Sequence, residues 1–233
     1  MMSVEHLAID GAQVTITAEV ELGRQATASG WAIVPSMGRA HPFTIYPSGH
    51  GEVLEEAARG TTSVDIGEIA EFSIKDGRLR VAEVRMPTAT GGERTLTVGV
   101  WEGRRGSLST SLIGSQSERL VEVFDTLSFG ERRGGLAIDS PITARPREPE
   151  VVTELPDLGI VAIRPAIASV LEKIPRSRGL RTGHGELFRM RATSDALALV
   201  TPSAVTALQP LDDGRADELM AVAEQMDVSW TPR

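Results

Sequence analysis

Two pairs of histidine and glutamate have residue types and a spacing that could perform chemistry. His50 precedes Glu52 by two positions, and His184 precedes Glu186 in the same way. On a strand each pair would project from one face, where imidazole and carboxylate can act as proton carriers or metal ligands. A zinc site needs three or four protein ligands, and the flanking glycines favour a turn. We therefore predict no metal site, and we keep a hydrolase or metal-dependent enzyme using either pair as the alternative function.

The second feature is a basic stretch in an acidic chain. Residues 173–191 contain one lysine and five arginines but only one acidic residue, Glu186. Guanidinium groups bind carboxylates and phosphates bidentately, so this stretch could dock an acidic protein surface or a phosphate-bearing ligand. The predicted partner-binding residues are Arg176, Arg178, Arg181 and Arg189. The competing interpretation is a solvated loop that balances the acidic C-terminal helix.

Motifs for other chemistries are absent from the sequence. It has no cysteine, no G-x-S-x-G nucleophile motif, and neither of the two glycine-rich loops that bind phosphates. We therefore expect no cofactor and no catalytic residues. The leading prediction is a non-catalytic binding or assembly module, such as an adaptor, an immunity-type protein or a structural component, that acts through protein–protein contacts. Its oligomeric state and the identity of its partner do not follow from the sequence.

Composition and charge exclude several classes of protein. The 233 residues are 41% hydrophobic and 24% charged, as in ordinary globular proteins, with a net charge of −8. That charge argues against bulk binding to nucleic acid or to anionic membranes. The first residues lack a signal peptide, and no apolar run approaches a membrane span. We expect a cytoplasmic protein, or one exported without an N-terminal signal. The preference for arginine over lysine is typical of GC-rich bacterial coding.

The clearest secondary-structure signal is an amphipathic helix within residues 114–130. Apolar residues recur there at helical spacing, with charged residues on the opposite side. Ser115 and Glu118 have the spacing of a capping box, and Gly130 ends the pattern. Phe124 is expected to be buried between this helix and a sheet formed by the preceding residues.

The residues before this helix read as short strands and turns. Residues 13–22 alternate apolar and polar side chains, and the ranges 31–34, 43–46, 79–86, 94–101 and 107–112 are further strand candidates. Asp76 and Gly77 are expected to supply the two positive-φ positions of a hairpin turn. This half is therefore predicted to be an antiparallel sheet closed by one helix.

The second half is predicted to be more helical. Residues 159–163, 186–191 and 196–200 read as strands, whereas 167–174, 202–208 and a segment from Asp212 or Asp213 read as helices. The predicted fold class is therefore α+β: an antiparallel sheet closed by an amphipathic helix, then a smaller α+β part. The expected domains are 1–130, a β-rich α+β domain, and 151–233, a smaller α+β domain. Between them 131–150 is a proline-rich connection, either an ordered crossover or a flexible linker.

Two tetrapeptides occur twice in the same order. LAID is found at 7–10 and 136–139, and GHGE at 49–52 and 183–186. Both halves also end in an amphipathic helix followed by LSF or VSW. These repeated tetrapeptides suggest a degenerate tandem repeat. The segments between them disagree, because 40–46 reads as strand and 167–174 as helix.

Overall fold

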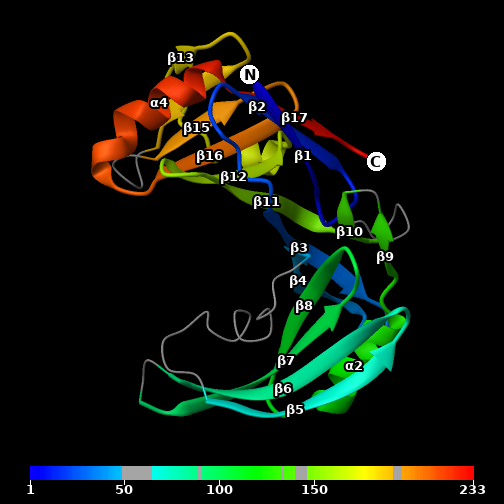
Figure 1. Ribbon diagram of the computed structural model, residues 1–233. Helices are drawn as coiled ribbons and strands as arrows, with labels where there is room; N and C mark the ends of the chain where they lie inside the picture. Colours follow the sequence, from blue (N-terminus) through cyan, green and yellow to red (C-terminus); the bar gives the residue numbers. More distant parts are fainter. Residues whose placement is uncertain (49–64, 89–90, 133, 140–145, 191–195) are drawn as a thin grey trace. The chain divides into compact units, whose positions relative to one another are not determined.

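The computed structural model describes residues 1–48, 65–88, 91–132, 134–139, 146–190 and 196–233. The chain forms two compact units (Figure 1). Unit 1 combines Met1–Ala28 with Glu148–Arg233, and unit 2 is Ser29–Arg147. The domains predicted from the sequence, 1–130 and 151–233, are consecutive stretches of chain. Unit 1 instead combines an early stretch of the chain with a late one. Residues 140–145 of the predicted proline-rich connection lie outside the described part.

Unit 2 is a run of antiparallel strands with one helix on its face. The strand order is β3-β4-β8-β7-β6-β5, and α2 packs mainly on β6 and β7. A separate hairpin pairs β9 with β10. The elements are β3 (Ala26–Val34), β4 (Arg39–Pro47), β5 (Asp65–Ile74), β6 (Gly77–Pro87), β7 (Glu93–Glu102), β8 (Gly106–Ile113), α2 (Ser117–Thr126), β9 (Phe129–Arg132) and β10 (Gly135–Ile138).

Unit 1 contains a second six-strand run and a three-stranded sheet. The run has the order β13-β14-β15-β16-β12-β11, and the small sheet is β1-β2-β17. Helix α4 packs on β16. The elements are β1 (Met2–Leu7), β2 (Gln13–Ala18), β11 (Arg147–Leu155), β12 (Gly159–Pro165), α3 (Ala168–Leu171), β13 (Leu180–Arg181), β14 (Glu186–Arg189), β15 (Leu197–Val200), β16 (Ala204–Pro210), the 3-10 turn η2 (Asp213–Arg215), α4 (Ala216–Gln225) and β17 (Asp227–Thr231).

The predicted α+β class is wrong, because the chain is mostly β, with 57% strand and 13% helix. Helix α2 exists, but it covers strands inside a six-strand run and does not close a sheet. The segment 202–208, predicted as a helix, contains most of β16, which pairs with both β12 and β15. The helix predicted over 167–174 is reduced to α3, which has no buried residue.

Helix α2 is positioned by Thr97 and not by the predicted capping box. The helix begins at Ser117, and its N-cap residue, Gln116, makes no side-chain capping bond. The buried hydroxyl of Thr97 donates to the Gly114 carbonyl at 2.7 Å and accepts from the Gln116 amide at 2.8 Å. Phe124 is fully buried, as expected. A Cβ on Gly99 would lie 2.5 Å from Leu120, so this glycine lets the helix approach β7 closely.

The β5–β6 hairpin forms one residue earlier than predicted. Ile74 pairs with Gly77, so the two turn residues are Lys75 and Asp76, and Lys75 takes φ 54°. Gly77 is needed for a different reason. A Cβ at this position would lie 2.5 Å from the Trp101 ring and 2.5 Å from the Glu102 carbonyl oxygen. The glycine therefore serves close packing and not turn conformation.

The two six-strand runs share one connectivity. When the second run is read in reverse, from β11 to β13, each of its strands occupies the position that the corresponding strand of β3 to β8 has in the first run. A helix and then a strand follow each run in the sequence. Buried apolar residues also recur at the same spacing after each run: Leu120, Phe124, Leu127 and Phe129, and Leu219, Ala223, Met226 and Val228. The repeated GHGE does not mark this correspondence. Its second copy ends at Glu186, the first residue of β14, whereas the first copy precedes β5 in the sequence and lies outside the described residues.

Candidate functional site

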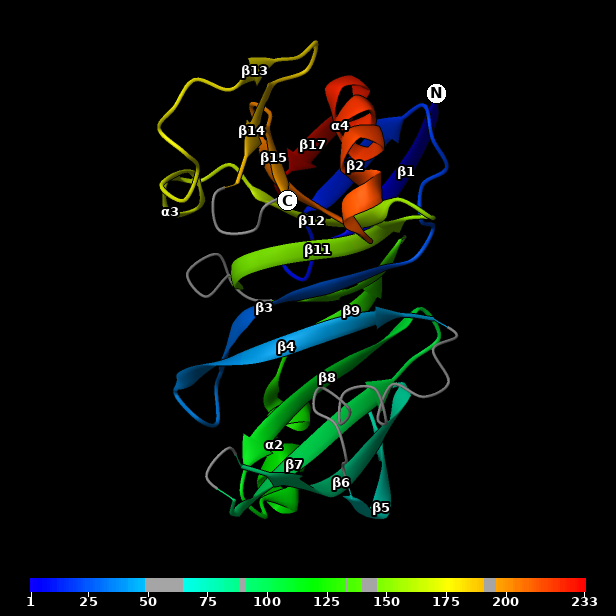
Figure 2. The ribbon, with the colours of Figure 1, turned by 90° about the vertical axis from the view of Figure 1, so that its left-hand side faces the viewer.

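The predicted arginines lie on one segment of unit 1. After β12 the chain forms α3 and then runs to β13, which pairs with β14 (Figure 2). The register places Leu180 opposite Leu187 and Arg181 opposite Glu186. Arg176 and Arg178 precede β13, and Arg189 ends β14. Together with Lys173 we call the four arginines the basic face.

Glu186 anchors the loop that carries Arg178. Its Oε1 accepts a 2.8 Å hydrogen bond from the backbone amide of Gly179. A Cβ on Gly179 would lie 2.6 Å from the Leu187 carbonyl oxygen and 2.8 Å from Cγ of Glu186. This glycine therefore allows the loop to lie directly against β14. The single acidic residue of the basic stretch is used for positioning the loop.

No carboxylate pairs with the basic face within the described residues. All five of its side chains belong to exposed residues. The one described partner is a methionine: Nη2 of Arg189 lies 3.8 Å from the sulfur of Met220 on α4. Elsewhere arginines such as Arg80, Arg164 and Arg215 form ion pairs with glutamates. The basic face is thus a concentration of positive charge without an ion-pair partner in the described part of an acidic chain.

A pocket of about 380 Å³ opens between Arg178 and Arg189. Its apolar walls come from β13, β14, β15 and α4: Leu180, Leu187, Phe188, Leu197 and Met220. Leu187 and Leu197 are buried, and Leu180 is 52% exposed. The pocket can therefore accommodate an apolar side chain of a ligand. The guanidinium groups of Arg178 and Arg189 at its border can bind acidic groups of the same ligand.

A second, more open hollow borders Arg176. It is lined by α3 and the residues after it, including Leu171, Glu172 and Ile174. Ile167 and Leu171 expose 46% and 40% of their surface. The sequence-based prediction missed this apolar component, because the spacing of residues 167–174 was interpreted only as a helix and not as an exposed surface. The available signal was the mixture of apolar and basic residues beside Pro165 and Pro175.

The structure does not bring His184 and Glu186 together as a chemical pair. His184 Nδ1 lies 3.7 Å from Asp227 Oδ2, and both side chains are largely exposed. Glu186 instead binds Gly179. The described residues contain no cluster of three potential metal ligands. His50 and Glu52 lie outside the described part, so the enzyme alternative based on them stays a prediction.

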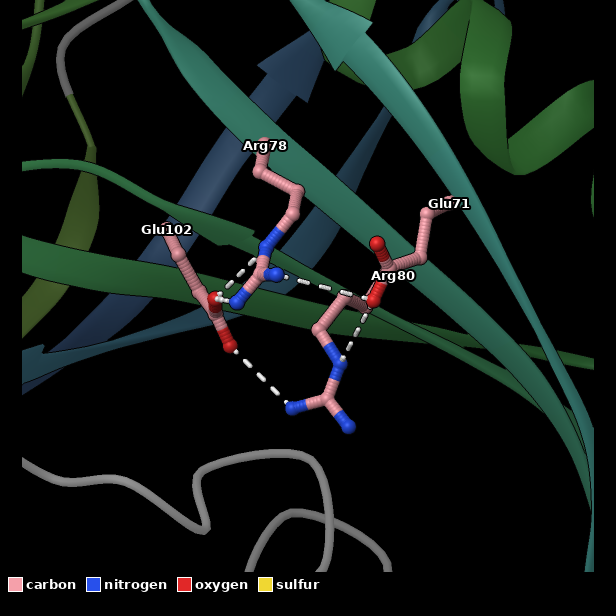
Figure 3. Close-up of polar contacts among 4 residues, drawn as sticks. All are labelled: Glu71, Arg78, Arg80 and Glu102. Atoms are coloured by element: carbon pink, nitrogen blue, oxygen red, sulfur yellow. Dashed lines mark hydrogen bonds and ion pairs between the residues drawn. The ribbon is translucent and has the colours of Figure 1, made fainter.

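A second charged arrangement lies on the strands of unit 2 (Figure 3). Glu102 on β7 accepts from Arg78 at 2.7 Å and from Arg80 at 3.3 Å. Glu71 on β5 completes the network, 3.7 Å from Arg78 and 3.8 Å from Arg80. The hydrogen bond to Glu102 raises the pKa of Arg78. Among the described contacts this network joins two arginines with two glutamates, and it connects three adjacent strands.

Comparison of the chain with protein-family models, curated proteins and solved structures finds no match. Among the described residues, no helix is both long enough and apolar enough to span a membrane.

Proposed function

We propose that this protein is a non-catalytic binding module that docks an acidic, partly apolar segment of another protein on the basic face. The observation that carries the proposal is the group of exposed arginines without a carboxylate partner in the described chain, bordering an apolar pocket. Carboxylates of a partner would supply the ion pairs that this face lacks.

Electrostatics supports recognition of an acidic partner. The net charge of −8 repels an acidic protein, but salt screens this repulsion beyond a Debye length of roughly 8–10 Å. Closer to the basic face, the local positive charge dominates. The basic face therefore both accelerates docking and orients the partner.

The apolar component favours a protein segment over a phosphate-bearing ligand. A phosphate needs only hydrogen-bond donors and positive charge, whereas Leu180 and Leu171 present exposed apolar surface in the hollows that the arginines border. Anchor side chains in pockets with charged rims are typical of protein interfaces. We infer that the preferred segment carries at least one large apolar side chain between acidic residues.

The test is fluorescence anisotropy with a labelled synthetic peptide rich in Glu and Leu. The variant reverses Arg176, Arg178 and Arg189 to Glu. Arg181 is left unchanged because its position lies opposite Glu186, where a second acid would destabilise the hairpin. The matched control reverses Arg24, Arg94 and Arg104, which are exposed and lie outside the basic face. Both variants have the same net charge.

We expect the first variant to bind the peptide at least about tenfold more weakly, with an unchanged melting temperature. The control should retain binding. A poly-Glu peptide without leucine should bind more weakly than the original probe, which separates the apolar contribution. Equal losses in both variants, or tighter binding of pyrophosphate than of the peptide, would overturn the proposal.

A further inference from the structure

Among the residues that the structure describes, the strand β5 forms an open edge of unit 2. It is the last strand in its run, and β6 is its one described neighbour (Figure 2). The register shifts between Ile66 and Ile69, so the regular part of the edge runs from Ile69 to Ile74. An unpaired edge offers free amides and carbonyls to an incoming strand.

The register identifies which backbone groups face outward. Ile74 and Gly77 close a two-residue turn and form a hydrogen-bonded pair, and such pairs alternate along an antiparallel ladder. Ala70, Phe72 and Ile74 therefore bond to β6. The amides and carbonyls of Ile69, Glu71 and Ser73 point away from β6, and the described residues provide no backbone partner for them.

The side chains along this edge offer both apolar and acidic groups. Phe72 and Ala70 are exposed, and they share the face of the sheet on which α2 packs. Beside them lies a hollow of about 430 Å³ bordered by β5, β6 and Ser117 of α2. Two glutamates, Glu68 and Glu83, line it against a single arginine, Arg85.

The edge is held in place from the opposite face. Glu71 contacts Arg78 and Arg80 on β6, and both arginines contact Glu102 on β7 (Figure 3). A network of this kind restrains the strand more than one isolated surface pair would. An incoming segment therefore meets an edge that is already extended.

We propose that the β5 edge from Ile69 to Ser73 accepts an extended segment of a partner protein as an added strand. The segment places an apolar side chain beside Phe72 and a basic side chain toward Glu68 and Glu83. Main-chain hydrogen bonds supply affinity and the two side-chain environments supply specificity, as in other cases of strand addition. This surface is independent of the basic face, which lies on unit 1.

A second copy of the chain is the less suitable occupant. The described side chains of β5 include Glu68 and Glu71 but no basic residue. Pairing this strand with itself brings like charges together, which destabilises cross-strand neighbours. The complementary occupant is a strand with Lys or Arg alternating with apolar residues.

The experiment uses the full chain and a synthetic peptide of alternating Val and Lys. Hydrogen exchange read by NMR should show fast exchange of the Ile69, Glu71 and Ser73 amides in the free protein. Saturating peptide should protect these three amides at least about tenfold, because each then bonds to the added strand. The Ala70, Phe72 and Ile74 amides should be protected from the start.

Two variants of this experiment separate strand addition from simple charge attraction. Ser73→Pro removes one outward amide without changing the net charge, and Ser73→Ala is its control. The proline variant, but not the alanine variant, should weaken peptide binding by at least about tenfold. A peptide N-methylated at alternate residues tests the same hydrogen bonds if the proline variant does not fold.

Several results would overturn the inference. One is full binding of the N-methylated peptide, which would reduce the interaction to charge attraction. Another is unchanged exchange of the three outward amides at saturating peptide. A third is a concentration-dependent dimer in sedimentation that Ser73→Pro abolishes, because the occupant of the edge would then be a second copy.

Discussion

The ammonium Nζ of Lys75 donates a 2.7 Å hydrogen bond to the backbone carbonyl of Phe124, and a second of 2.7 Å to the carbonyl of Leu127. Both carbonyls lie at the C-terminal end of α2, where backbone acceptors lack partners within the helix and the helix dipole favours a cation. The same ammonium lies 4.4 Å from the centre of the Phe129 ring. A residue of the β5–β6 turn thus caps the helix packed on that sheet.

Replacing Lys75 by Met should therefore destabilise the protein. Charge-assisted hydrogen bonds contribute about 1.5–3 kcal/mol, so a loss in this range is expected in urea unfolding. Lys75→Gly should lose less, because φ 54° costs a non-glycine residue about 1–2 kcal/mol and glycine relieves that strain. If both variants unfold within about 0.5 kcal/mol of the wild type, the range of ordinary surface substitutions, the ammonium does not stabilise the helix end.

Gly77→Ala should destabilise the hairpin by crowding. The new Cβ would lie 2.5 Å from the carbonyl oxygen of Glu102, a backbone atom that cannot rotate away. Trp101, on the other side, is fixed by a 2.9 Å hydrogen bond from its Nε1 to the Ile74 carbonyl. We expect a loss of about 1–3 kcal/mol, as in other overpacked sites. Gly183→Ala, with no neighbouring atom within 4 Å, is the control and should be near neutral.

His6 should make stability fall on mild acidification. Burial lowers the pKa of His6, against a smaller raising effect of a backbone hydrogen bond with Gly23. The unfolded chain then binds a proton near pH 6.5 while the folded chain does not. The contribution of His6 to the free energy of unfolding is therefore fully present above about pH 6.5. It is lost as the pH falls from there toward the lowered pKa of the folded state, at up to about 1.4 kcal/mol per pH unit.

Urea unfolding of the wild type and His6→Gln between pH 7 and pH 5, the range in which histidine titrates, checks this expectation. The variant should show a shallower decline than the wild type. Identical slopes for the two proteins would show that His6 is not the group responsible.

Glu186→Ala should weaken binding at the basic face without removing a charge that contacts the partner. The substitution frees the Gly179 amide and loosens the loop that carries Arg178. Hydrogen exchange of the Gly179 amide should accelerate, and affinity for the Glu/Leu peptide should fall a few-fold, because the loop must then be ordered on binding. Glu186→Gln keeps an oxygen acceptor and should bind more nearly like the wild type. Unchanged exchange in the alanine variant would contradict the anchoring role.

The local sequence determined those helices and strands whose hydrophobic pattern is compatible with only one type of secondary structure. The stripe containing Leu120 and Phe124 can only bury itself as a helix, and the alternation of residues 13–18 suits a strand with one face in the core. The basic stretch was also visible, because charge needs no tertiary context to be counted. Its adjacency to an apolar pocket was not, since the pocket walls include Leu197 of β15 and Met220 of α4, which only the folded chain brings together with the arginines.

The tertiary structure decided the remainder, because pairing partners and packing neighbours override local preference. Thr201 and Pro202 resemble the start of a helix, yet Thr201 caps a tight turn by accepting from the Ala204 amide at 3.1 Å. The residues after it become β16 because β12 and β15 satisfy its backbone on both sides. Likewise β2 pairs with β17 from the opposite end of the chain. The local hydrophobic pattern does not specify such a distant partner, and sheet formation is the gain that compensates the loop entropy of bringing the ends together.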